Sequence, residues 1–267
     1  MTINNRIPKS EMTNTHVLTR SNATGLQAAD RDFQVVDRGG EVLTNVRVHI
    51  IYWGSAWSSN ASPSMHDVNN TVITVVSSPY LTGLSQYRGI GRGRVGTIIQ
   101  VNKQVGSSPA EPINNFTHNI IETLVSDLIQ HGIVPHPSTD QNLYCVFLPK
   151  DYHYKDSNLV GEHNCFSLND GTLTYYAWIT NDGTLTGKNS IPRIVSHEIV
   201  EACTDPNPDH PGAFVIPNSS GGADEISDVC QNENDFDFEP GGVMVQTYWS
   251  QRDHRCIAPK TLHVSTI

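Results

Sequence analysis

The chain has 267 residues and a formal net charge of −10, with 17 lysine and arginine residues against 27 acidic ones. This balance lacks the dense basic surface that releases counterions from phosphate, so we expect no nucleic-acid partner. The apolar runs are far shorter than the ~20 residues of a membrane span, so we expect a soluble protein without membrane association.

The first 40 residues differ in character from the rest. Residues 1–40 are polar, lack an apolar period and end at Gly39-Gly40, which predicts a flexible N-terminal arm. The length of the chain allows one large domain or two modest ones, and we favour a single domain over residues 41–267.

Predicted strands and helices then follow along the chain. Residues 46–53 are β-branched and aromatic, which predicts a strand buried on at least one face. After a short apolar segment at residues 68–76, residues 116–128 have the apolar spacing of an amphipathic helix that Gly132 ends. Two further strands are predicted at residues 143–148 and 174–180. This order predicts an α+β fold, a layered α/β domain with long loops.

The next helix carries the candidate chemistry. Ser190 or Asn189 caps it, and the sequence continues through Ser-His-Glu-Ile-Val-Glu at residues 196–201. His197 and Glu201 are four residues apart and share a helix face, so both can hold one metal ion. Glu198 lies one position round and can accept a proton from water at that ion. The alternative is an exposed helix face held by salt bridges.

An acidic segment at residues 224–228 offers further ligands. If it is helical, Glu225 and Asp228 share a face, with Glu225 as third metal ligand and Asp228 as the partner that braces His197. Asp224 in place of Glu225, Asp228 as a ligand itself, and a solvated acidic turn all remain open. His210, in a proline-flanked loop, is a more remote donor.

These two segments together resemble the thermolysin-like zincins, or gluzincins. The sequence departs from that group twice, since Glu201 stands where histidine is expected and the spacing from Glu225 to Asp228 is one residue shorter. The resemblance implies a mixed sheet packed on an active-site helix, and a Zn²⁺ cofactor held by His197, Glu201, Glu225 and Asp228. It also implies a metallopeptidase that cleaves peptide or protein substrates, with Glu198 as catalytic base. We expect it to act as a monomer.

A wider likeness runs through much of the chain after residue 45. Residues 48–54, 161–165, 176–179 and 202–206, with Cys256, resemble the Exordium or phosphate-induced protein family. That family is secreted and linked to growth and cell walls, although the N-terminus here lacks the apolar region of a secretory signal. The resemblance implies a second possible function, a non-catalytic extracellular or cell-wall-associated binding protein with the zincin fold.

Two local expectations concern packing and substrate. The five cysteines form no Cys-x-x-Cys pair, and both a Cys230–Cys256 disulfide and five reduced thiols are open. Residues 174–179 precede the motif helix, where zincins keep the edge strand that pairs with an extended peptide. A simple core strand is the equal alternative.

Overall fold

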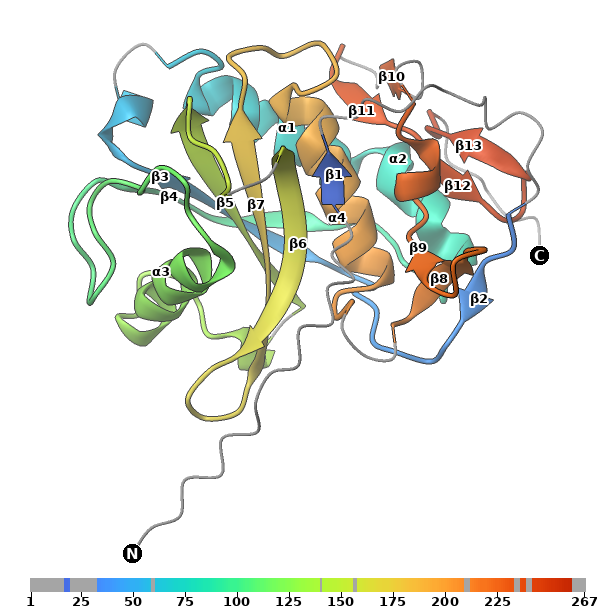
Figure 1. The fold of residues 1–267 in the computed structure, drawn as a ribbon, viewed down its shortest axis with the longest axis horizontal. Coiled ribbons are helices and arrows are strands. Elements are labelled where there is room, and N and C mark those ends of the chain that lie inside the picture. The colour runs from blue at the N-terminus through green and yellow to red at the C-terminus, as the bar shows by residue number, and fades with distance from the viewer. Residues whose placement is uncertain are drawn as a thin grey trace, which may run out of the picture.

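The computed structural model describes residues 17–19, 33–58, 61–139, 141–155, 158–208, 212–232, 236–238 and 242–260. Its centre is a mixed sheet with helices on both faces (Figure 1), which confirms the α+β prediction. The long strands are β3 (Arg47–Trp53), β4 (Arg94–Val101), β5 (Asn142–Lys150), β6 (Leu159–Ser167) and β7 (Leu173–Asn181). None of the described helices is long and apolar enough to cross a lipid bilayer.

The strands have the order β1-β6-β7-β5-β3-β4. Strands β7, β5, β3 and β4 are parallel, whereas β6 is antiparallel to β7. The short strand β1 (Val17–Thr19) pairs antiparallel with β6. Because β7 lies between β6 and β5, the edge-strand alternative for residues 174–179 is wrong, and the equal alternative of a core strand is confirmed. Its long apolar run suits an internal strand, buried on both faces.

Side chains alternate between two cores, one on each face of the sheet. On β5, Cys145 and Phe147 pack towards helices α1 (Met65–Ser77) and α4 (Ile191–Thr204). Tyr144 and Val146 point the other way, into a core that helix α3 (His118–Gln130) covers. The predicted amphipathic helix is therefore confirmed as α3, and Gly132 follows it with a φ of +65° that suits glycine.

Shorter elements follow α4. They are β8 (Phe214–Pro217), β9 (Ala223–Asp224), a 3₁₀ turn η5 (Asp228–Cys230), β10 (Phe236–Phe238), β11 (Met244–Gln246), β12 (Tyr248–Ser250) and β13 (Arg255–Ile257). The Cys230–Cys256 disulfide is present, with a Cα–Cα distance of 5.9 Å, while Cys145 and Cys203 are buried thiols. The alternative of five reduced thiols is thus wrong.

The acidic segment is not helical, so the condition under which Glu225 and Asp228 would share a helix face is not met. Strand β9 ends at Asp224, and a 3₁₀ turn begins at Asp228. Tertiary contacts hold the segment in place of helical hydrogen bonds, because Trp249 N–H donates to Ile226 O at 2.8 Å and Cys230 is cross-linked. Most of the predicted arm, and His210, lie outside the described residues. Within the arm, β2 (Val36–Asp37) pairs with β8.

Candidate metal centre

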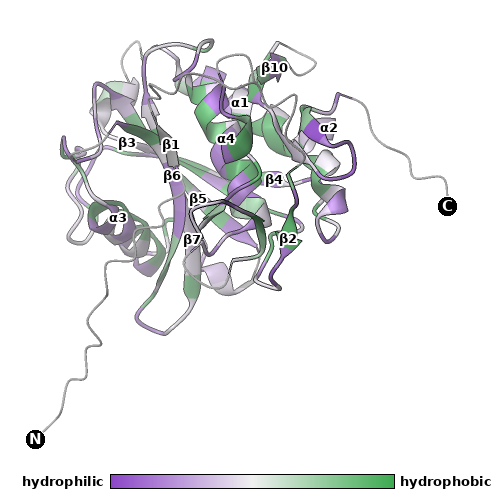
Figure 2. Cartoon of the chain, turned by 45° about the vertical axis from the view of Figure 1, so that its right-hand side comes forward, coloured by the Kyte–Doolittle hydropathy of each residue, from purple (hydrophilic) through white to green (hydrophobic). Residues whose placement is uncertain are grey.

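Helix α4 runs through the interior of the protein. Pro192 occupies its first turn, a position that proline tolerates, and every residue from Ile191 to Thr204 is buried. Figure 2 shows hydrophilic bands between its hydrophobic turns. His197, Glu198 and Glu201 are all 0% exposed. The alternative of an exposed, salt-bridged helix face is therefore wrong.

The motif residues of α4 contact the acidic segment directly. His197 Nε2 lies 3.0 Å from Glu201 Oε2 and 3.6 Å from Asp228 Oδ1. Glu225 is 0% exposed, so a solvated acidic turn is wrong for this residue, while the Asp228 side chain keeps 13% of its surface exposed. Asp228 thus marks the side of the cluster nearest solvent. Asp224 takes no part, since its Oδ1 accepts a hydrogen bond from Asn218 Nδ2 at 3.1 Å.

A second histidine enters the cluster from the sheet. His163 on β6 places Nδ1 3.6 Å from both Glu198 Oε2 and Glu201 Oε2, and Nε2 3.5 Å from Glu225 Oε1. Sequence reasoning quoted this residue only as part of a family resemblance and missed its place in the site. No local spacing links it to His197, which lies 34 positions downstream.

The donors form two overlapping groups. One contains His163, Glu201 and Glu225, and the other contains His197, Glu201 and Asp228. Each offers ligand atoms that lie within 4.8 Å of one another. Imidazole and carboxylate together are an ordinary zinc ligand set. Glu201 belongs to both groups and is therefore the central donor.

The hydrogen bonding of the buried carboxylates shows whether a cation would suit this cluster. In the described part of the chain, no carboxylate oxygen of Glu198 or Glu201 accepts a well-aligned hydrogen bond, although all four oxygens are buried and His197 Nε2 lies 3.0 Å from Glu201 Oε2. Burying a carboxylate without a partner costs several kcal/mol, unless it is protonated or paired with a cation. A divalent cation between these groups would satisfy them, so the residues present fit a metal.

The same burial shifts the proton affinity of the acids. The pKa of Glu198 is raised to about 8, chiefly by burial. The nearby His197 lowers this pKa, whereas the negative charge of Asp228 raises it further. The pKa values of Glu201 and Glu225 lie well above the ordinary range, first because of burial and then because of the neighbouring carboxylates. A cation would reverse these shifts by favouring the ionised forms.

Gln246 on β11 braces His197 where Asp228 was expected. Gln246 Nε2 lies 2.7 Å from His197 Nδ1, whereas Asp228 faces Nε2. The Gln246 backbone N–H donates to Ser196 Oγ at 2.9 Å, which ties β11 to α4. Sequence reasoning missed Gln246 because a short strand 49 positions after His197 carries no motif.

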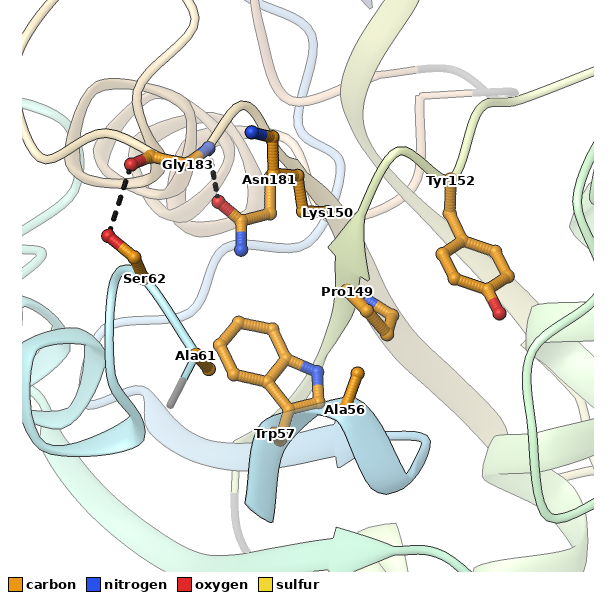
Figure 3. Close-up of a pocket in the computed structure, with 9 residues that line it drawn as sticks. All are labelled: Ala56, Trp57, Ala61, Ser62, Pro149, Lys150, Tyr152, Asn181 and Gly183. Atoms are coloured by element: carbon orange, nitrogen blue, oxygen red, sulfur yellow. Dashed lines mark hydrogen bonds between the residues drawn. The ribbon is translucent and has the colours of Figure 1, made fainter. Parts of the chain in front are cut away.

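A cavity of about 400 Å³ lies apart from the cluster. Residues at or beyond the ends of strands β3, β5 and β7 line it (Figure 3), among them Trp57, Lys150 and Asn181. None of the metal-cluster residues lines it.

Comparisons with known proteins give a distant structural likeness. No protein-family model and no curated protein sequence matches this chain. The solved structure of metalloproteinase-II from Bacteroides fragilis is similar with a TM-score of 0.35 and 12% sequence identity. The match covers 65% of this chain and 48% of that one, so this chain spans about half the length of that protein. A likeness this distant carries no argument, and the functional case rests on the cluster.

Proposed function

We propose that the protein is a zinc-dependent hydrolase, a metallopeptidase in which the second histidine of the usual motif is replaced by Glu201. The observation that carries this proposal is the buried cluster, partly exposed only at Asp228, in which Glu201 joins two groups of imidazole and carboxylate donors. When bound, Zn²⁺ supplies Lewis acidity that activates water and polarises a carbonyl. Zinc is chosen because the donors combine nitrogen and oxygen.

Glu198 is the catalytic base in this proposal. It follows His197 directly on α4, and its Oε2 lies 3.6 Å from His163 Nδ1, beside the donors. Its carboxylate takes a proton from the attacking water and passes it to the leaving amine. The substrate reaches the cluster from the side of Asp228, the member with exposed surface.

A paired assay tests the proposal. Zinc content is measured by elemental analysis after dialysis against metal-free buffer, and hydrolysis is followed with a mixed peptide library. The parent should hold zinc and cut peptides. Glu198→Gln should keep the zinc and lose about 100-fold or more in rate, the contribution of a general base. A parent without zinc, or a Glu198→Gln variant as fast as the parent, would sink the proposal.

One observation favours a second function. All donors except Asp228 are at most 1% exposed, which suits a structural metal ion in a non-catalytic binding protein. The cell-wall-associated alternative fits this arrangement. A parent that holds zinc and cuts no peptide would support it.

A further inference from the structure

We propose that His163 of β6, and not His197 of the motif helix, is the imidazole that holds the cation, with Glu201 and Glu225 as its carboxylate partners. This assignment rests on the proposed metal centre and specifies its ligands. The metal would then lie between strand β6 and helix α4. His197 would not bind the metal but would hold the Glu201 side chain in position.

Hydrogen bonding determines which nitrogen of His163 can bind a metal. His163 Nε2 lies 3.0 Å from the backbone O of Asp205, and both groups are buried. A carbonyl oxygen only accepts, so Nε2 carries the hydrogen and Nδ1 keeps the lone pair of the neutral ring. Nδ1 is also the atom that faces Glu198 and Glu201, while Glu225 Oε1 lies 3.5 Å from Nε2 on the other side of the ring. Metal-bound histidines commonly donate their other N–H to a carbonyl in this way.

His197 has the opposite arrangement. The Gln246 amide nitrogen only donates, so at 2.7 Å it donates a hydrogen bond to Nδ1 of His197, which must be the acceptor. The neutral ring must then carry its hydrogen on Nε2, the atom 3.0 Å from Glu201 Oε2. A ring nitrogen that bears a hydrogen has no lone pair in the ring plane with which to bind a metal.

The amide of Gln246 is held in this orientation at both ends. Its Nε2 also donates to Ser227 O at 3.0 Å, and its Oε1 accepts from Arg193 Nε at 3.4 Å. If the amide were turned so that its oxygen accepted from His197, that oxygen would face the Ser227 carbonyl oxygen and the amide nitrogen would face the Arg193 guanidinium. Both contacts would then repel, since two acceptors or two donors would meet. Binding through His197 therefore breaks two buried contacts, whereas binding through His163 Nδ1 leaves the contact between Nε2 and Asp205 O in place.

Zinc affinity of matched variants tests this assignment. Parent, His163→Gln, His197→Gln and the exposed control His66→Gln are compared by chelator competition, with circular dichroism as the folding check. His163→Gln should lose stoichiometric zinc. His197→Gln should keep it, within the roughly 10–100-fold weakening that outer partners of a metal show. The control should match the parent.

A rescue variant separates a ligand role from a structural one. Gln246→Glu provides an acceptor for His197 Nδ1–H and so frees Nε2 for a metal. Added to His163→Gln, it should restore zinc binding. In the metal-free parent, nitrogen NMR should find the hydrogen on Nε2 of both rings, and zinc should shift Nδ1 of His163. This measurement does not depend on any variant folding.

The outcomes distinguish the two proposals. A parent that takes up no zinc removes the metal centre itself, and this assignment with it. A parent that holds zinc, together with a His163→Gln variant that holds it equally or a His197→Gln variant that loses it, overturns only the assignment. A zinc-induced shift at His197 Nε2 in place of His163 Nδ1 does the same.

Discussion

Gly161 of β6 lies directly against Glu198 of α4. A Cβ atom at position 161 would stand 2.7 Å from Glu198 Oε1 and 2.3 Å from Ile194 Cγ2, closer than side chains approach. Gly161 and His163 are two positions apart on one strand, so they face the same helix. The absence of a side chain at 161 thus lets β6 bring His163 within reach of Glu201.

Gly161→Ala should therefore both destabilise the protein and weaken the site. Overpacking of this kind typically costs about 1–3 kcal/mol, because α4 or β6 must shift. Denaturant unfolding measures the loss, and chelator competition measures the zinc affinity. Gly91→Ala is the matched control, since its Cβ would meet only ordinary contacts, the nearest at 3.6 Å. Equal stability of the two variants would contradict the close packing of β6 on α4.

Local spacing was enough to predict part of the site. His197, Glu198 and Glu201 are placed by the helical repeat alone, and the structure finds them adjacent and buried. Glu225 and Asp228 lie in the segment that the sequence singled out, but its non-helical shape could not be predicted, because the contacts that shape it come from distant residues such as Trp249.

Distant pairing could not be predicted in the same way. His163 reaches the cluster only because β6 pairs antiparallel with β7 and so lies beside α4. Residues 174–180, closed by the turn residues that follow, predicted a strand, but not which strands flank it. Strand order depends on the whole topology, and for that reason β7 was wrongly considered for the edge.

The metal-free protein should lose stability as pH rises. The Glu198 carboxyl has its pKa raised from an ordinary 4.5 to about 8, so between these values the folded state binds more protons than the unfolded state. Its stabilising contribution is present below pH 4.5 and is lost as pH approaches 8. The pKa values of Glu201 and Glu225 shift in the same direction.

Thermal unfolding of dialysed protein between pH 5 and pH 8 measures this dependence. Added zinc should reverse it, because a metal binds the deprotonated ligands. Metal-free protein that grows more stable across this range would show that the buried carboxyls are already ionised.

Among the carboxylates, Glu201 should matter most for zinc affinity. It alone belongs to both donor groups, so Glu201→Gln should weaken binding beyond the roughly 100-fold limit of outer partners. Asp228→Asn should stay within about 10–100-fold, because the proposed ligand set does not include it. Asp224→Asn is the control, since Asp224 lies outside the cluster. Chelator competition ranks all three, and an Asp228 effect as large as that of Glu201 would contradict the ranking.

Strand β1 lies along the part of β6 that faces α4, with Val17 opposite Glu162 and Leu18 opposite Gly161. Its backbone covers an edge to which an extended peptide could otherwise pair beside His163. Removing residues 1–19 should therefore raise the rate of peptide hydrolysis severalfold, while removing residues 1–12 leaves β1 in place and should change nothing. Size-exclusion chromatography checks that the freed edge does not join two copies of the chain. If both truncated proteins cut peptides at the rate of the full chain, β1 does not obstruct the substrate and the peptide must approach from another side.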